Sequence, residues 1–385
     1  MVEDTRQYIL DFFQASPEEY ICIFTANASS TLKLVGEAYP FGAGCRYLLT
    51  FDNHNSINGI REYASAKGAS VTYLPVVLPD MRVDTTRLKD ELDLLDSGCF
   101  NLFAYPAQSN FSGVQHPLDW IDQAHNKGWD VLLDAAAFVP TNSLDLSNSH
   151  PDFVPVSFYK MFGYPTGVGA LIARRETLCK LSRSWFAGGT TSVASVRGNK
   201  YYPADAPFKF EDGTVNFLSI PAVGIGLRYI QEIGYPLIHK RVTYLTGWLL
   251  KQLHSLKHAN RNHLIQIYGP LNTEARGGSI ALNFLDAGGD LIPKQILEKE
   301  AAKRNISIRM GFFCNPGAGE VALNISTDEL ASCFTRSAYI DRITDLDFQH
   351  CIDPKASGAV RVSLGLVSNC EDVQAFLDFA RTFLT

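Results

Sequence analysis

The sequence predicts an α/β protein with a doubly wound, mostly parallel central sheet, helices on both faces and a smaller C-terminal α+β lobe. Two observations support this fold class. Between residues 20 and 174, short apolar runs alternate with amphipathic helical patterns, which is typical of β-α-β units. Residues 221–256 then form one long helical stretch, after which strand and helix patterns mix. We therefore expect a large domain at residues 1–256, including the long connecting helices, and a small domain at residues 257–385.

The expected strands of the large sheet are apolar runs that are rich in β-branched and aromatic residues. They are residues 20–24, 46–51, 70–76, 100–106, 130–135, 153–158 and 169–174. The expected helices between them are residues 29–39, 56–68 and 118–128, and strands near 278–284 and 359–364 belong to the small lobe.

Bulk composition excludes several classes of function. The chain has 385 residues, of which 46% are hydrophobic, and its net charge of −6 gives no basic surface for nucleic acid or an anionic membrane. No apolar stretch is long enough for a membrane span, and the charged N-terminus does not resemble a signal peptide. The eight cysteines show no metal-ligand spacing. We expect a cytoplasmic protein with reduced thiols and no metal site.

Candidate functional residues lie at strand ends, because ligands of such sheets bind at the carboxyl ends of the strands. After the first strand come Ala28 and Ser29, at the start of a helix. Their backbone amides and the Ser29 hydroxyl could hold a phosphate at the positive end of that helix. A serine that only caps the helix explains the same residues equally well.

Asp134 ends the fifth expected strand and is followed by three alanines. A carboxylate at the end of a buried strand requires a cationic partner, since burial alone would cost several kcal/mol. The protonated ring nitrogen of a cofactor is one such partner, and a structural ion pair is the other.

Lys160 stands among aromatic and small residues in "SFYKMFGYPTGVGALI" (157–172), without an acidic residue four positions away. It is either a surface lysine on an irregular loop or a desolvated amine of lowered pKa that attacks a carbonyl group. Ser157, three residues earlier, can face the same pocket. A phosphate cradle, a carboxylate and an amine at three strand ends are together what pyridoxal phosphate requires.

The segment around Lys160 resembles the cofactor-binding segment of fold-type I, class V pyridoxal-phosphate enzymes, the group of cysteine desulfurases and selenocysteine lyases. Within this group, the segment resembles the aminotransferase-like domain of molybdenum cofactor sulfurases in particular. The other segments of resemblance are "IFTANASSTLKLV", "DNHNSINGIREYA", "SNFSG", "LLDAAAFVP", "FEDGTVNFLSI", "RMGFFCNPGAG" and "GAVRVSLG". They occur in the family's order across nearly the whole chain.

The resemblance implies roles for the residues at the strand ends. Lys160 is expected to bind the cofactor's aldehyde and Asp134 its ring nitrogen. Ala28, Ser29 and Ser157 are expected to form the phosphate site.

The resemblance extends to the ring and substrate contacts. A ring that stacks on the cofactor is expected at His54, although alignment without gaps places Asn53 there, and a lone histidine would more commonly cap a helix. Asn110 is expected near the cofactor and the substrate carboxylate. Arg361 is expected to bind that carboxylate, for which its planar guanidinium is suited, although alone it would suggest a surface ion pair.

In cysteine desulfurases the "FE-x-GT" pattern reaches the phosphate bound by the neighbouring subunit. Gly213 and Thr214 of "FEDGT" are therefore expected cofactor contacts across a homodimer.

Cys314 fits the family's R-x-G-x-x-C pattern, in which the cysteine takes the substrate's sulfur as a persulfide. Gly311, Pro316, Gly317 and Gly319 are expected to let its loop move. The alternative is an inert thiol, our interpretation of the other cysteines.

The implied function is sulfur mobilisation from L-cysteine, with release of alanine and with the molybdenum cofactor as an acceptor. The family's N-terminal segment and the sulfurases' C-terminal domain are not found in this sequence, which suggests a truncated product. Two alternatives stay open: a class V enzyme with other chemistry (a C–S lyase, an epimerase or a decarboxylase), and a non-catalytic paralogue.

Overall fold

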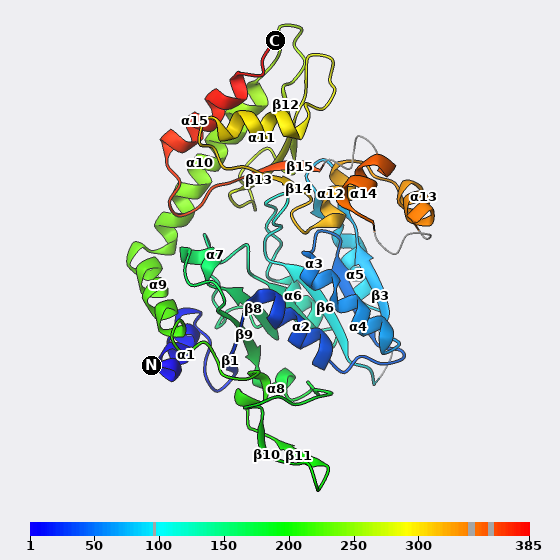
Figure 1. Ribbon diagram of the computed structural model, residues 1–385, viewed down its shortest axis with the longest axis vertical. Helices are drawn as coiled ribbons and strands as arrows, with labels where there is room; N and C mark the ends of the chain where they lie inside the picture. The colour runs from blue at the N-terminus through cyan, green and yellow to red at the C-terminus, as the bar shows by residue number, and fades with distance from the viewer. Residues whose placement is uncertain (95–97, 338–342, 353–357) are drawn as a thin grey trace.

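The computed structural model describes residues 1–94, 98–337, 343–352 and 358–385 (Figure 1). A seven-stranded sheet forms its centre, in the order β1-β9-β8-β7-β6-β2-β3. Its strands are β1 (Tyr20–Thr25), β2 (Arg46–Thr50), β3 (Ser70–Leu74), β6 (Asn101–Pro106), β7 (Trp129–Asp134), β8 (Phe153–Ser157) and β9 (Gly169–Arg174). These are the expected strands. Six run in one direction, and only β9 is antiparallel to its neighbours, so the prediction of a mostly parallel sheet is confirmed.

Helices cover both faces of this sheet, because alternate side chains of each strand point to opposite sides. In β1, Tyr20, Cys22 and Phe24 pack into one core and Ile21 and Ile23 into the other. The first core is covered by α1 (Val2–Phe12), α5 (Thr85–Leu92), α6 (Trp120–His125) and α9 (Ile220–Ile233). The second is covered by α2 (Ala28–Ala38), α3 (Asn55–Asn58), α4 (Ile60–Ala66) and α8 (Arg175–Leu178).

A second, antiparallel sheet has the order β12-β13-β15-β14. Its strands are β12 (Ile265–Tyr268), β13 (Ser279–Phe284), β14 (Arg309–Gly311) and β15 (Ala359–Ser363), and it lies beside α10 (Tyr235–Ser255), α11 (Lys294–Ala302) and α15 (Cys370–Arg381). Because α10 packs against both α15 and β12, a domain division at residue 256 stays a prediction.

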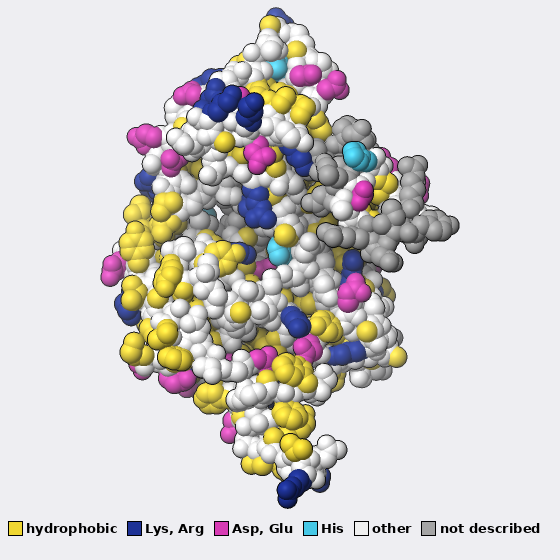
Figure 2. All heavy atoms as spheres, viewed as in Figure 1, with side chains coloured by type: hydrophobic (Ala, Val, Ile, Leu, Met, Phe, Trp, Pro, Cys, Tyr) yellow, Lys and Arg dark blue, Asp and Glu magenta, His cyan; other side chains and the backbone are white. Residues whose placement is uncertain are grey.

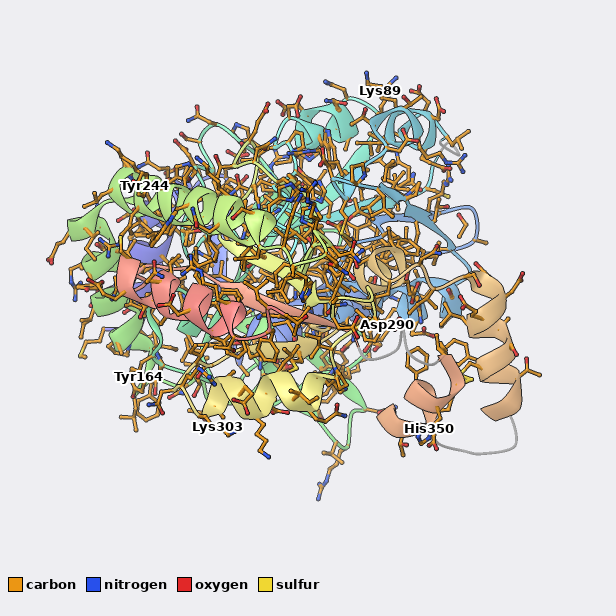
Figure 3. The ribbon with its side chains drawn as sticks, turned by 90° about the horizontal axis from the view of Figure 1, so that it is seen from above. Lys89, Tyr164, Tyr244, Asp290, Lys303 and His350 are labelled. Carbon is orange, nitrogen blue, oxygen red and sulfur yellow. A yellow bond between two sulfur atoms is a disulfide. The ribbon has the colours of Figure 1, made fainter. Side chains whose placement is uncertain are left out.

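Three helices follow β14 and lie on the side of α3: α12 (Pro316–Ala322), α13 (Thr327–Ser337) and α14 (Asp345–Ile352). Seen from above (Figure 3), α14, marked by His350, lies with α13 at one side of the molecule, away from α10 and its Tyr244. Cys333 of α13 and Cys351 of α14 form a disulfide. The expectation that all cysteines are reduced is therefore wrong for this pair, which two helices separated in sequence bring together.

Several short elements were not predicted. A hairpin of β10 (Thr191–Ser195) and β11 (Lys200–Pro203) projects from the end of the large sheet opposite the second sheet (Figure 1). The others are β4 (Val76–Val77), β5 (Arg82–Val83), α7 (Tyr159–Phe162) and a 3-10 turn at Phe208–Phe210. Within the described ranges, every helix is too short or too polar to cross a membrane.

Candidate active site

The carboxyl ends of the six parallel strands meet at one edge of the large sheet, and a pocket of about 230 Å³ lies there. Its lining residues come from the segments after β1, β2, β6, β7 and β8: Asn27, Ala28, Ser29, Leu32, Asp52, His54, Ser56, Pro106, Gln108, Asn110, Asp134, Ala136, Ala137, Ser157, Tyr159 and Lys160. Seven of the predicted site residues thus line one cavity.

The start of α2 and the end of β8 form one corner of this pocket. The side chain of Asn27 caps α2 by accepting a hydrogen bond from the backbone amide of Ser30 (2.9 Å). The amide of Ala28 donates to Ser157 Oγ (2.9 Å), and the hydroxyls of Ser29 and Ser56 are 2.7 Å apart. Because the helix cap is Asn27, Ser29 is not needed for that purpose. Amides and hydroxyls at a helix N-terminus suit an anionic group.

Asp134 ends β7 with its carboxylate buried, only 8% of the residue being exposed. Its Oδ1 accepts a hydrogen bond from the amide of Ala136 (3.0 Å). Among the residues that the structure describes, no cationic side chain lies within ion-pair distance of this carboxylate. A buried carboxylate without a cation, beside the small side chains of Ala136 and Ala137, fits the protonated ring nitrogen of pyridoxal phosphate.

Lys160 projects from the short helix α7, directly after β8, and lines the same pocket. Its side chain is exposed, so the expected desolvation of the amine by protein atoms is wrong. The reason is that α7 lies at the open edge of the sheet, where few protein side chains surround it. Lys160 also has no ion-pair partner within the described chain, and an exposed amine at this position can reach a carbonyl group in the pocket.

The structure separates His54 from Asn53. Asn53 is fully buried, and its amide nitrogen donates to the carbonyl oxygens of Thr50 (2.9 Å) and Ala104 (3.1 Å). His54 lines the pocket, and its Nδ1 accepts a hydrogen bond from the amide of Ser56 (3.1 Å), so it also caps α3.

The pKa of His54 is lowered, chiefly by burial, against the opposing effect of the Asp134 charge. The charges of Lys160, Arg309 and Arg361 lower it further. Burial in the pocket therefore favours the neutral form of the His54 ring.

Two arginines lie at the rim of the pocket, paired side by side in β14 and β15. Arg361 Nη1 donates to the carbonyl oxygen of Asn110 (3.0 Å), and its guanidinium lies over the ring of Phe313 at 4.9 Å. Burial, and next the charge of Arg309, lower the pKa of Arg361. Figure 2 shows a histidine and basic side chains where the two sheets' lobes meet. Two cationic groups at the rim suit a substrate that carries a carboxylate.

Cys314 is exposed on the turn between β14 and α12. The expectation that Gly311, Pro316, Gly317 and Gly319 let this turn move stays a prediction, but the structure gives Gly317 and Gly319 a second role in packing. A Cβ on Gly317 would lie 2.0 Å from the carbonyl oxygen of Phe51, and one on Gly319 would lie 2.1 Å from the ring of Phe312. These glycines allow α12 to pack closely. Gly311, with a φ of 111° and open space where a Cβ would lie, is the last residue of β14, just before the turn.

Gly213 and Thr214 lie outside this pocket. Both are exposed on the loop after the 3-10 turn, and Thr214 lines a separate cavity of about 310 Å³. Within one chain these two residues therefore lie apart from the other site residues, and their contact across a homodimer stays a prediction.

Sequence reasoning missed four residues at this site. Asp52 and Gln108 line the pocket, Arg309 stands at its rim, and Asn315 is fully buried beside Cys314. Arg309 and Asn315 both belong to the "RMGFFCNPGAG" motif that carries Cys314. Their place in this motif could have indicated that they lie near the site. Asp52 and Gln108 follow strand ends and could have been found by the same rule as Asp134.

Comparisons with known proteins agree with this geometry. The chain is 35% identical to the molybdenum cofactor sulfurase of Arabidopsis thaliana over 98% of its length and 50% of that protein, and 37% identical to that of Bos taurus over 98% and 44%. The chain thus spans about half the length of these relatives. A cysteine desulfurase of Thermococcus onnurineus has the same fold, with a TM-score of 0.80 at 23% identity, covering 99% of this chain and 83% of that one. The family model for aminotransferase class-V matches residues 1–376. The chain belongs to the aminotransferase class-V family, as its motifs predicted.

Proposed function

We propose that this protein is a pyridoxal-phosphate enzyme that takes sulfur from L-cysteine, forms a persulfide on Cys314 and releases L-alanine. The observation that carries the proposal is the buried carboxylate of Asp134, which has no protein cation within the described residues and shares a pocket with the exposed amine of Lys160. An aldehyde cofactor with a basic ring nitrogen satisfies both groups.

In this proposal, different pocket residues bind different parts of the cofactor. Lys160 would hold the aldehyde, Asp134 would hold the proton on the ring nitrogen, and the ring of His54 would contact the cofactor ring. Ala28, Ser29 and Ser157 would hold the phosphate. Bound in this way, pyridoxal phosphate supplies an electron sink for bonds next to the substrate's amino group.

Arg361 binds the carboxylate of L-cysteine, with Asn110 beside it. The Cys314 thiolate attacks the sulfur of the substrate. The carbon–sulfur bond of the substrate breaks, a sulfur–sulfur bond forms on Cys314, and the carbon keeps the electron pair and takes up a proton. The attacking group must be a thiolate, and Cys314 is a free thiol. We propose a cytosolic location because six of the eight cysteines are free thiols, although Cys333 and Cys351 form a disulfide.

We also propose a homodimer, in which Gly213 and Thr214 of one subunit approach the phosphate site of the other. Exposed apolar residues surround this loop, among them Phe217 (54% exposed) and Leu218 (82%). Such a patch supports association. The sulfur acceptor would be the molybdenum cofactor, by similarity to the sulfurases.

The cofactor assignment is tested by borohydride reduction of the protein with pyridoxal phosphate, followed by peptide mass analysis. We expect one pyridoxyl group, on Lys160, and none in Lys160→Ala. A label on another lysine, or no label, would rule out the assignment.

The sulfur transfer is tested by incubating the holoenzyme with L-cysteine and measuring L-alanine and protein persulfide. Cys314→Ser should bind L-cysteine, as the visible spectrum reports, yet form no persulfide. Cys370→Ser is the matched control, since Cys370 is also an exposed free thiol. Pyruvate or D-alanine in place of L-alanine would indicate lyase or epimerase chemistry instead.

A further inference from the structure

Cys314 is an exposed residue between two buried ones. Phe313 is 4% exposed and packs against Phe111, with the ring centroids 5.3 Å apart, while Asn315 is fully buried. Phe313 and Cys314 both have a φ of 56°, a left-handed backbone that residues with a Cβ rarely adopt. Contacts on either side must therefore hold this turn in shape.

Asn315 makes most of these contacts. Its amide nitrogen donates to the carbonyl oxygen of Asp52 (2.6 Å) and to the side-chain oxygen of Asn110 (2.8 Å). Its own oxygen accepts from the amide of Ala318 (3.2 Å) and so caps α12. One side chain thus joins the start of α12 to the loops that follow β2 and β6 in the large sheet.

The neighbouring carbonyl groups are bound to the same two loops. Asn110 donates from its side-chain nitrogen to the carbonyl oxygen of Phe313 (2.8 Å), and the amide of Asn55 donates to that of Cys314 (2.6 Å). Asn55 directly follows His54, and Asn110 also accepts the hydrogen bond of Arg361. The turn is therefore fixed to segments that carry pocket residues.

We propose that Asn315 is a positioning residue: by docking the Cys314 turn on the loops after β2 and β6, it fixes where the sulfur-accepting thiol lies relative to the pocket. This inference rests on the proposed function, because it assigns a role in sulfur transfer. It assigns the side chain of Asn110 chiefly to the turn, since its oxygen and one of its two amide hydrogens are bound there.

The two functions of the Asn315 amide can be tested separately, because its nitrogen donates to the two loops and its oxygen caps α12. Asn315→Asp keeps an oxygen that can accept from the amide of Ala318, and aspartate caps helices as well as asparagine does. It replaces the donating nitrogen by a carboxylate oxygen, which is repelled by the oxygen atoms of Asp52 and Asn110. Asn315→Ser is an uncharged second variant whose hydroxyl can cap but is too short to reach both loops. Asn369→Asp is the matched control, because Asn369 caps α15 through its oxygen alone.

The first measurement is hydrogen exchange of the holoenzyme. Residues 312–319 should exchange at least tenfold faster in both Asn315 variants than in the wild type and in Asn369→Asp. The strand peptide 129–134 should be unchanged in all, which reports that the fold is intact. Equal exchange in residues 312–319 would overturn the inference.

The second measurement is a single turnover with L-cysteine. The variants should reach the same half-saturation of the cofactor's spectral change within about twofold, because substrate binding is kept, while persulfide formation on Cys314 slows at least tenfold. If exchange is faster in the variants but persulfide forms within twofold of the wild-type rate, the positioning role of Asn315 is overturned and the proposed function is not. If the wild type itself forms no persulfide, the proposed function is overturned too.

Discussion

Arg6 and Glu211 form a buried ion pair, with Arg6 Nη1 and Glu211 Oε1 2.6 Å apart. The same carboxylate oxygen accepts a hydrogen bond from the amide of Phe24 (2.8 Å). Because Glu211 belongs to the "FEDGT" segment, this pair joins α1 and β1 to the loop that carries Gly213 and Thr214. A helix at the start of the chain thus supports the proposed subunit contact.

Removing one partner of this pair leaves the other charge buried, which costs about 3–5 kcal/mol. We expect Glu211→Gln to lower the free energy of urea unfolding by that amount and to weaken dimer formation in analytical ultracentrifugation. Glu3→Gln is the control, since Glu3 contacts Arg6 from an exposed position (65% of its side chain), and it should cost less than about 1 kcal/mol. Equal losses in the two variants would contradict the importance of the buried pair.

Asp134→Asn should keep the hydrogen bond from the amide of Ala136 but remove the charge that we propose to pair with the cofactor's ring nitrogen. We expect L-alanine formation by the holoenzyme to fall roughly 100-fold, as for other losses of fixed charge at reacting groups. Asp145→Asn, a half-buried carboxylate away from the pocket with local hydrogen bonds only, should be unaffected. Turnover close to wild type in Asp134→Asn would argue against a charged ring partner.

The pH dependence of folding stability should report on His54, which lies in the pocket. Burial lowers its pKa in the folded protein, so below about pH 6.5 the unfolded chain binds a proton there that the folded protein does not. Stability from this residue is therefore present above that pH and is lost on acidification. Between about pH 7 and about pH 5.5, the unfolding free energy of His54→Gln should fall less than that of wild type. The exposed His350, replaced by Gln, should give the wild-type slope.

Arg361→Lys keeps a positive charge but loses the planar pair of donors. We expect the KM for L-cysteine to rise roughly tenfold, the loss of about one charge-assisted hydrogen bond, with a smaller change in kcat. Steady-state kinetics of L-alanine release measure both. Arg381→Lys, on the exposed end of α15, is the control. A change in kcat alone would contradict a role in holding the carboxylate.

Gly317→Ala would place a Cβ 2.0 Å from the carbonyl oxygen of Phe51, a backbone atom that cannot move aside. We expect it to lower the unfolding free energy by about 1–3 kcal/mol, as overpacking does. Gly365→Ala meets nothing within 4 Å and should be neutral. Equal stability of the two variants would show that α12 shifts freely on the large sheet.

The sequence alone determined the sheet and the chemistry of its edge. The apolar runs from β1 to β9 are local sequence patterns, and β-α-β connections make neighbouring strands run in the same direction. The sequence could therefore assign Asp134, Ser157 and Lys160 to the same edge of the sheet. The class V motifs could be identified from the sequence because each is a short segment whose residue spacing is set by a local backbone turn.

Tertiary structure decided which side chains face the pocket. Asn53 and His54 are adjacent in sequence, but hydrogen bonds to Thr50 and to Ala104 on a neighbouring strand hold Asn53 in the core. His54 lines the pocket instead. The docking of Asn315, the packing of Gly317 and the pairing of Cys333 with Cys351 likewise join atoms distant along the chain. Such contacts depend on distances and directions set by the whole fold, which no local sequence pattern encodes.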